Sequence, residues 1–567
     1  MTVRFPSRGS LVTDLPIALA GLAIFYAFIA LAHYWTAPVH AQTEIDLSPS
    51  ALPGYALFSV ARIAVAYLAS LIFAIAYGYI AARHARAERL MIPLLDTLQS
   101  IPVLCFLPGV MLSMVALFPF TQFGLEIGSI LLIFTGQVWN MAFSFYTSLK
   151  SIPREMSEAA DLYRLSPWQR FLQLDLPFSA IGLIWNSMMS VAGGWFSLMV
   201  CEMFTLGDRD LRLPGLGSYL QTAANAGAMG PILWGIAAMI MVIVLIDQLV
   251  WRPAIAWSEK FKFEQVESSD AAGSFVLDFL RRSKLLARAA RATVIPAREA
   301  LTLHFARSAA RKREPRKRDA WLPRIAMFAA LAAIVYATAR MTALLTKITA
   351  PELHGIFVGA GATFLRVELT LLLAALWTIP AGVYIGLNPK LASFAQPLAQ
   401  IAASVPAPAL FPVVLLLLIR IGGGLGIASI ILLLLGTQWY ILFNVIAGAT
   451  AIPSDLKEVC GVFQLSSAQR WRKLLLPAIF PYLITGFVTA SGGAWNASII
   501  AEYFKFRGQT FSLTGLGAVI SRATDAGNFP VLVGATIVIS ATVVTVNRLL
   551  WRRLYRIAST RFTLDAA

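Results

Sequence analysis

The sequence predicts an all-α integral membrane protein made of two tandem six-helix repeats, with about 12 transmembrane helices. Three observations carry this prediction. The chain has 567 residues, of which 58% are hydrophobic and 13% charged, whereas an average soluble protein has roughly 45–50% apolar and about 25% charged residues. Apolar runs long enough to cross a bilayer, which takes about 20 helical residues, recur along the chain. The second half of the sequence also repeats the first at a nearly constant spacing.

The apolar runs form two groups of six. They lie near 16–35, 57–81, 92–117, 124–148, 178–203 and 231–250, and then near 322–345, 362–386, 394–420, 424–448, 478–502 and 530–549. The alternative for the first run is a cleaved signal peptide, but Pro16 to Tyr34 is longer than the usual apolar core of about 7–15 residues. The run 322–345 holds the equivalent place in the second half, where no signal peptide can lie. We therefore interpret both runs as membrane-spanning helices.

The distribution of charge predicts the orientation. The formal net charge is +17, and 17 Lys and Arg against 8 Asp and Glu lie between Arg252 and Arg324. Basic residues gathered between apolar spans follow the positive-inside pattern and suit anionic headgroups, so we expect membrane lipids, and no nucleic acid, as partners. The short loops 82–91 and 150–176 are basic, whereas 36–55 carries two acidic residues and no Lys or Arg. We therefore expect the basic loops, the central linker and both termini in the cytoplasm.

The internal repeat holds its register over most of the chain. At a spacing of 304, Arg62, Gly78, Pro93 and Pro102 recur as Arg366, Gly382, Pro397 and Pro406. After a four-residue deletion the spacing becomes 300 as far as Trp251 and Trp551. Because each repeat has an even number of spans, both copies enter the membrane in the same orientation. We expect a first repeat over 1–255, a basic cytoplasmic linker over 256–320 and a second repeat over 321–567.

The most informative segments are the loops between the fourth and fifth spans, 151–177 and 451–477. Each loop is expected to form two short helices. Ser151 can cap the first helix of the first loop, and Ser166, with a glutamine three residues later, forms a capping box for the second. The second loop keeps that box at Ser466. A loop this structured is suited to being held by a partner.

The Glu-Ala-Ala pattern at Glu158, followed by an apolar helix and Leu176-Pro177, resembles the coupling loop of ATP-binding-cassette importer permeases. Further landmarks are similar to the nitrate, sulfonate, taurine and bicarbonate branch of that family. They are Arg62 and Arg366, Pro102 and Pro406, Trp195 and Glu202, Trp495 and Glu502, Gly215-Leu-Gly217 and Gly515-Leu-Gly517. Two such permeases in one chain resemble the duplicated, fused version of that branch.

The resemblance implies a function and partners. In the family, a small-residue helix of this loop docks in a groove of a cytoplasmic ATPase. This implies two ABC ATPase subunits and a periplasmic or lipid-anchored solute-binding protein as partners, and a permease that passes a small solute, an anion such as nitrate, a sulfonate or bicarbonate, across a bacterial inner membrane. The docking residues that it implies are Glu158, Ala159, Ala160, Leu165, Glu458, Val459, Cys460 and Leu465.

Two departures from the family pattern separate the loops. The family's glycine six residues after the glutamate is Arg164 in the first loop and Gln464 in the second. The second loop also has Val459-Cys460 in place of Ala-Ala. We therefore expect the first loop to dock more as the family does than the second.

The sequence has no site for chemistry of its own. No Gly-x-x-x-x-Gly-Lys-Ser/Thr phosphate loop is present, so we expect no enzyme activity or cofactor in this chain, with ATP and Mg²⁺ on the partner ATPase. Five histidines and three cysteines show no metal-ligand spacing, so we expect no metal site and no catalytic residue. The alternative function is a twelve-helix secondary transporter driven by an ion gradient. Proton or sodium coupling needs acidic residues within the spans, and few lie within the apolar runs, which argues against this alternative.

Charged residues within spans are candidates for the translocation path, because charge inside a bilayer is costly. Arg62 and Arg366 lie about five residues, or roughly 8 Å, inside their helices. Two interpretations stay open, namely arginines that extend to the headgroups and an arginine pair that attracts an anion. The second interpretation predicts that lysine at both sites retains transport that glutamine loses.

The other path candidates lie near the outer ends of the spans. Glu202 and Glu502 end the fifth spans, where they either terminate the helices or face the path. Trp195 and Trp495 are expected either to pack in the core or to line the gap between the repeats. The remaining candidates are Ser197, Asn496 and Arg420.

Overall fold

The structure is a computed structural model, and the residues that it describes are almost all helical. It describes residues 14–19, 22, 34–35, 44–206, 209–261, 274–296, 299–300, 302–303, 321–420, 424–506 and 509–561.

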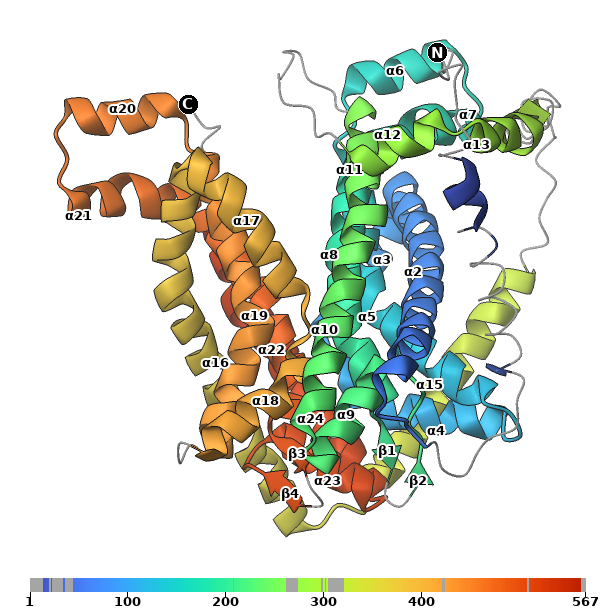
Figure 1. Cartoon of the computed structure of the whole chain (residues 1–567), viewed down its shortest axis with the longest axis vertical. Coiled ribbons are helices and arrows are strands. Elements are labelled where there is room, and N and C mark those ends of the chain that lie inside the picture. The colour runs from blue at the N-terminus through green and yellow to red at the C-terminus, as the bar shows by residue number, and fades with distance from the viewer. Residues whose placement is uncertain are drawn as a thin grey trace.

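Long helices from both repeats run side by side between two ends of the molecule (Figure 1). Among the described residues, eight helices are long and apolar enough to cross a membrane, or up to ten if each of two bent pairs forms one span. The predicted all-α membrane fold is confirmed. The long helices are α2 (Leu52–Arg83), α5 (Phe123–Lys150), α8 (Leu176–Glu202), α10 (Met229–Ile246), α16 (Ala350–Leu387), α19 (Leu425–Thr450), α22 (Leu476–Ala501) and α24 (Phe529–Val546).

The structure describes the first predicted span of the second repeat, but only a few residues of the first span of the first repeat. α15 (Trp321–Leu345) covers the predicted run 322–345 and packs on α24. The run 16–35 lies for the most part outside the described residues. A total of twelve spans therefore stays a prediction.

The third span of each repeat is broken, whereas the sequence predicted one continuous helix. The two pieces meet at 85° in the first repeat and at 80° in the second. Ile101 (ψ 129°) and Val405 (ψ 118°) are extended at the breaks. The proline that follows each of them removes a backbone donor and disfavours the helical region for the residue before it. The pieces are α3 (Ala85–Ser100), α4 (Leu107–Leu117), α17 (Pro389–Ser404) and α18 (Ala407–Arg420), with a 3₁₀ turn at Val103–Phe106.

Shorter elements occupy the two ends of the bundle, which we name the loop end and the hairpin end. The loop end carries α6 (Arg154–Leu162), α7 (Pro167–Arg170), α20 (Ser454–Val462) and α21 (Ser467–Arg470). The hairpin end carries α9 (Leu216–Ala226), α23 (Leu516–Asp525) and the antiparallel pairs β1–β2 (Thr205–Leu206, Arg209–Asp210) and β3–β4 (Tyr503–Phe506, Gln509–Ser512).

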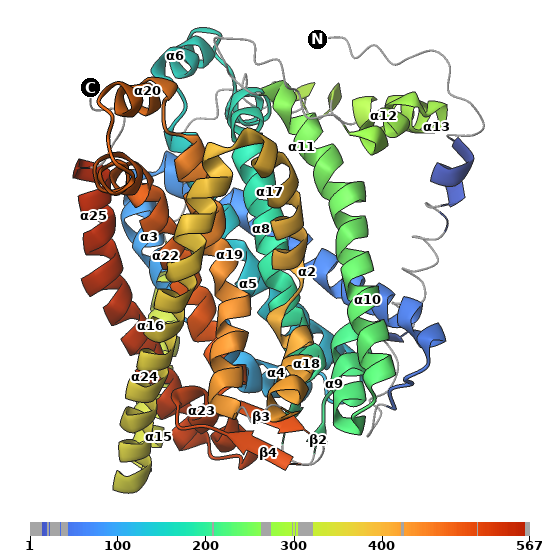
Figure 2. The ribbon, with the colours of Figure 1, turned by 60° about the vertical axis from the view of Figure 1, so that its left-hand side comes forward.

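The remaining helices lie around the loop end. α11 (Arg252–Ser258), α12 (Phe275–Arg282) and α13 (Lys284–Ala289) follow the sixth span of the first repeat, and α25 (Arg552–Arg561) follows that of the second (Figure 2). The fifth and sixth spans of both repeats contain a π-helical turn at matching places. These turns are Phe171–Asp175, Asp247–Trp251, Trp471–Leu475 and Asn547–Trp551.

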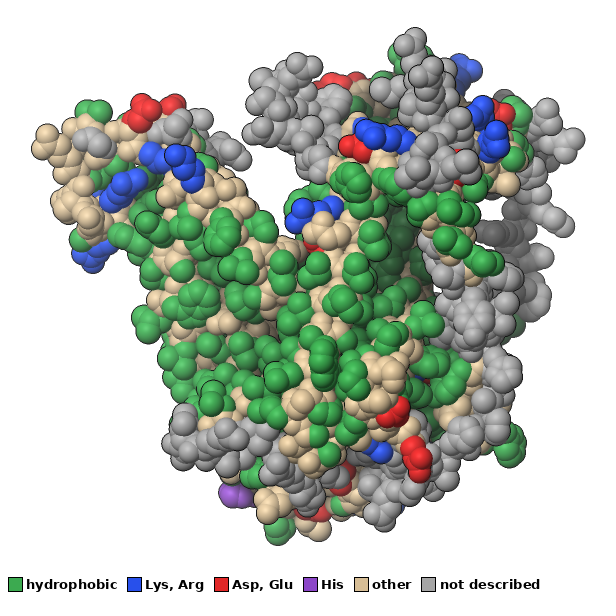
Figure 3. Space-filling model, in the orientation of Figure 1, with side chains coloured by type: hydrophobic (Ala, Val, Ile, Leu, Met, Phe, Trp, Pro, Cys, Tyr) green, Lys and Arg blue, Asp and Glu red, His purple; other side chains and the backbone are tan. Residues whose placement is uncertain are grey.

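The two repeats pack on each other through their third and fifth spans and also through their sixth, since α10 contacts α17 and α24 contacts α3. α8 contacts α17 and α18 of the second repeat, and α22 contacts the 3₁₀ turn Val103–Phe106 of the first. Hydrophobic side chains cover the middle of the molecule, and at the loop end a notch separates α20 and α21 from the rest of the surface (Figure 3). On this face, the repeats are thus apart at the loop end and joined at the hairpin end.

Candidate functional site

The first loop folds into two short helices, as predicted. Ser166 accepts a hydrogen bond from the Gln169 amide at 3.3 Å, and the Gln169 side chain accepts one from the Ser166 amide at 2.9 Å. The predicted capping box is therefore confirmed. The predicted Ser151 cap is wrong, because Pro153 precedes α6 and the Ser151 hydroxyl instead donates to the Ser148 carbonyl. The second loop repeats the box at Ser466.

The residues expected to dock a partner have the same exposure at matching positions of the two loops. Glu158, Ala159, Glu458 and Val459 are exposed, Ala160 and Cys460 are buried, and Leu165 and Leu465 are half-buried. Each loop therefore presents its glutamate outward and packs its small residue inward.

Each loop also exposes two large apolar side chains that the sequence analysis did not single out. Leu162 and Tyr163 are 81% and 78% exposed, and Val462 and Phe463 are 79% and 72% exposed. Large apolar side chains at the tip of an otherwise polar helix are typical of a surface that a partner covers. An apolar pair at the same place in both repeats was the sequence signal for them.

The turn between the two helices of each loop has a left-handed residue. Arg164 has φ 49° and Gln464 has φ 48°, and these two residues stand where the family pattern has glycine. The Leu165 amide donates to the Ala160 carbonyl at 3.1 Å, which is the long-range bond of a Schellman cap. A side chain in this conformation costs about 1–2 kcal/mol. The turn therefore keeps the geometry of a glycine turn without glycine.

At the hairpin end, Arg62 of α2 lies at the centre of a buried cluster that we name the first outer cluster, formed by Ser59, Arg62, Glu126, Glu202 and Gly217. The Arg62 guanidinium donates to Glu126 at 2.7 and 2.6 Å and to Glu202 at 2.8 Å. Glu202 also accepts from the Ser59 hydroxyl at 2.7 Å and from the Gly217 amide at 2.8 Å. Arg62, Glu126 and Glu202 have no exposed surface. The cluster thus joins α2, α5, α8 and α9.

The second outer cluster repeats this arrangement with one carboxylate fewer and consists of Thr363, Arg366, Glu502 and Gly517. Glu502 is fully buried and accepts from Arg366, from the Thr363 hydroxyl at 2.8 Å and from the Gly517 amide at 2.8 Å. Gly426 stands where the first repeat has Glu126. The Arg366 side chain is 15% exposed.

The recurring Gly-Leu-Gly segments belong to these clusters. A Cβ atom on Gly215 would overlap the Glu202 carboxylate, and one on Gly515 would overlap that of Glu502. A Cβ on Gly217 would lie 2.8 Å from the Met199 carbonyl oxygen. Glycine is required here by close approach, because the backbone itself passes directly over each glutamate.

The outer clusters show the surroundings of four path candidates and correct the interpretation of two of them, Arg62 and Arg366. Arg62 neither extends to headgroups nor faces an opening, and Arg366 shares its charge with Glu502. Glu202 is the last residue of α8 and Glu502 is the C-cap of α22, as the helix-end interpretation has it, and both are also ion-pair partners inside the bundle. Anion attraction by this arginine pair has no support in the geometry, because each positive charge is neutralised by a neighbouring carboxylate.

The other path candidates lie mostly in the core. Trp195 and Trp495 are 2% and 0% exposed and belong to the main hydrophobic core, as the packing interpretation has it. Ser197 is buried, and the half-buried Asn496 donates to the Gly492 carbonyl at 3.1 Å. The side chain of Arg420 lies outside the described residues.

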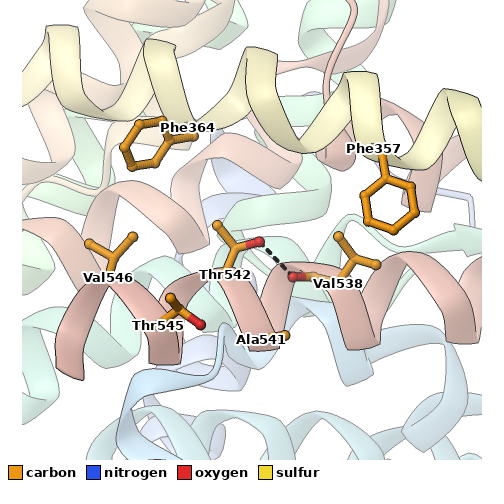
Figure 4. Close-up of a pocket in the computed structure, with 7 residues that line it drawn as sticks. All are labelled: Phe357, Phe364, Val538, Ala541, Thr542, Thr545 and Val546. Carbon is orange, nitrogen blue, oxygen red and sulfur yellow. Dashed lines mark hydrogen bonds between the residues drawn. The ribbon is translucent and has the colours of Figure 1, made fainter. Parts of the chain in front are cut away.

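An apolar groove between α16 and α24 is a poor site for a hydrophilic solute (Figure 4). The dashed line in Figure 4 is the hydrogen bond that the Thr542 hydroxyl donates to the Val538 carbonyl at 2.8 Å. The groove carries no charged side chain, and its lining residues are Phe357, Phe364, Val538, Ala541, Thr542, Thr545 and Val546. Among the described residues, no group of acidic, histidine and cysteine side chains is arranged to hold a metal ion.

Comparison with known proteins matches the chain twice to one family. Residues 74–250 and 378–561 each match the family described as "Binding-protein-dependent transport system inner membrane component". The two matches correspond to the two repeats and together cover more than half of the chain.

Similar proteins carry the names of permeases for small anions. The nitrate import permease protein NrtB of Leptolyngbya laminosa is 32% identical over 149 residues, which are 26% of this chain and 52% of that protein. The bicarbonate transport system permease protein CmpB of Synechococcus elongatus is 32% identical over 148 residues, with the same coverage. The putative aliphatic sulfonates transport permease protein SsuC of Bacillus subtilis is 27% identical over 206 residues, or 34% and 73% of the two chains. The chain spans about half the length of the two cyanobacterial relatives.

Proposed function

Because the chain belongs to the family of binding-protein-dependent transport system inner membrane components and contains the family unit twice, we propose that it supplies both membrane halves of an ATP-driven importer. The solute passes between the repeats from a periplasmic or lipid-anchored binding protein to the cytoplasm. The chain itself carries out no chemistry, and ATP and Mg²⁺ bind to the partner ATPases. The loop end is cytoplasmic in this proposal, as the basic loops indicate.

The observation that carries the proposal is the pair of loops at one end of the molecule. Both loops expose a glutamate and two large apolar residues on helices of equal length, α6 and α20. Two docking surfaces in one chain call for two ATPase subunits. The notch between the repeats at the same end supports a path that opens toward the ATPases (Figure 3).

The proposed solute is a small anion such as nitrate, bicarbonate or a sulfonate. The support comes from the names of the similar permeases. The arginines of the outer clusters add nothing to it, since their charges are taken up by Glu126, Glu202 and Glu502.

The alternative, an ion-gradient-driven transporter, has one observation in its favour. Glu368 in α16 is half-buried, and one of its carboxylate oxygens is buried without a hydrogen-bond partner. The buried acids of the outer clusters do not favour that function, because they are paired with arginine and are not free to bind a coupling ion.

The proposal predicts that one chain co-purifies with two ATPase subunits and that both loops contribute. Replacing Glu158 and Glu458 together with arginine is expected to lower the recovered ATPase at least about tenfold, because a charge reversal at an interface costs several kcal/mol. Recovery is measured by affinity purification followed by quantification of both subunits. The control is Asp278→Arg, an exposed position on α12 that lies outside both docking loops. Equal recovery of ATPase with the double variant and the wild type would contradict the docking assignment.

A further inference from the structure

At the loop end of the first repeat, Arg170 ties the helix that presents the docking surface to the rest of the bundle. Its guanidinium donates to the Asp161 carboxylate at 3.0 Å and to the Ser157 hydroxyl at 3.1 Å. Asp161 and Ser157 both lie on α6, and Arg170 ends α7. Any displacement of α6 therefore acts on Arg170.

Asp175 continues this chain of contacts into the bundle. It is fully buried at the end of the π-helical turn before α8, and its carboxylate accepts from Arg83, the last residue of α2, at 2.5 Å. Arg170 Nε lies 3.9 Å from the same oxygen. This separation is too long for a hydrogen bond, and Arg170 Nε and the other carboxylate oxygen are both buried without partners. A small movement of Arg170 toward Asp175 would close the network.

The second repeat keeps the arginine but lacks all of its partners. Arg470 stands at the place of Arg170, and among the described residues it makes no ion pair. The residues that stand in place of Asp161, Ser157, Asp175 and Arg83 are Gly461, Lys457, Leu475 and Leu387. Leu475 is 3% exposed, so the corresponding junction packs through apolar contacts.

The two helices that Asp175 and Arg83 join are joined again at the hairpin end. α2 carries Arg62 and α8 carries Glu202, which pair at 2.8 Å in the first outer cluster. At both ends, therefore, an ion pair with a buried carboxylate holds the two helices together. In the second repeat, an ion pair joins the matching helices at the hairpin end, and apolar packing takes its place at the loop end.

We propose that Arg170 and Asp175 are positioning residues that transmit movement of the first coupling helix, α6, to α2 and α8. The second coupling helix, α20, has no counterpart of this linkage, because Leu475 and Leu387 stand in place of Asp175 and Arg83. The two ATPase-docking loops are then unequal, and the first transmits ATP-driven movement to the path. This inference rests on the proposed function, because it assigns a role within the same coupling machinery. Chains of packed side chains and ion pairs are a known physical route for such coupling.

The test compares Arg170→Gln with its matched control, Arg470→Gln, in the full complex with ATPase and binding protein in liposomes. Both substitutions remove one partly buried arginine from the same place in the two repeats. Arg170→Gln is expected to lower the solute moved per ATP hydrolysed about fivefold or more, a typical size for a coupling effect, while ATPase recovery stays unchanged. Arg470→Gln is expected to remain close to the wild type. Equal losses in the two variants would overturn the inference.

A second measurement on the isolated full chain separates this inference from the proposed function. Amide hydrogen exchange in 154–162 is expected to rise in Arg170→Gln, and exchange in 454–462 is expected to stay unchanged in Arg470→Gln. Unchanged amide exchange in 154–162 of the Arg170→Gln variant would overturn the linkage even if ATPases bind. If amide exchange in 154–162 rises but no ATPase co-purifies with the wild-type chain, the proposed function fails and the coupling role fails with it.

Discussion

Replacing Arg62 with glutamine is expected to lower the free energy of unfolding by about 3–5 kcal/mol, the usual effect of removing one partner from a buried ion pair. Glu126 and Glu202 are both fully buried, and Arg62 is the cation with which both of them pair. Without it, two carboxylates remain in a low-dielectric environment. The free energy of unfolding is measured by detergent titration of the purified chain. Arg62→Lys is expected to recover only part of the loss, because an ammonium cannot reproduce the forked contacts.

The second repeat offers the matched control for this prediction. Arg366→Gln is expected to destabilise the chain less, because Arg366 faces one carboxylate and keeps 15% exposure. Adding Glu126→Gln to Arg62→Gln is expected to recover stability, since it removes one of the two uncompensated charges. An Arg62→Gln chain that unfolds like the wild type but loses anion uptake would instead support an arginine that acts on the solute.

Replacing Gly215 with alanine is expected to have the second largest effect, a destabilisation of about 1–3 kcal/mol, as is usual for overpacking in a core. The added methyl group would overlap the Glu202 carboxylate and displace it from Arg62 and from the Gly217 amide. The midpoint of thermal unfolding in detergent measures the effect.

The control for the glycine prediction is Gly361→Ala in α16. An added Cβ there meets nothing within 4 Å, and alanine is favoured over glycine in a helix by about 1 kcal/mol. This variant is expected to be as stable as the wild type or more so. Equal midpoints for Gly215→Ala and Gly361→Ala would show that close approach does not explain the Gly-Leu-Gly segments.

Local and periodic features of the structure could be predicted from the sequence. Apolar run length predicts the long helices such as α5 and α19, and the spacing of Ser166 and Gln169 predicts a capping box, because each depends on residues close in the chain. The breaks at Ile101 and Val405 escaped prediction because average hydropathy does not register the conformational limits that proline imposes on its neighbour.

The outer clusters could not be derived because their members are far apart in sequence. Arg62 is 64 residues from Glu126 and 140 from Glu202. An arginine inside an apolar run suggests either snorkelling or a solute contact when its partner is unknown. The available signal was the joint recurrence of an arginine and a glutamate, opposite charges within spans, at matching places in both repeats. The asymmetry at Asp175 and Leu475 was present in the sequence as well, but its meaning required the contacts with Arg83 and Arg170.

In the proposed function, ATP hydrolysis by docked ATPases drives solute import through this chain. The most direct test is uptake of labelled nitrate, bicarbonate and an aliphatic sulfonate by cells that express the chain. Uptake is compared after deletion of the partner ATPase and after collapse of the proton gradient with ATP maintained. Uptake of one of these anions is expected to disappear with the ATPase and to survive loss of the gradient. Uptake that continues without the ATPase and stops with the uncoupler would contradict it and would favour transport driven by an ion gradient.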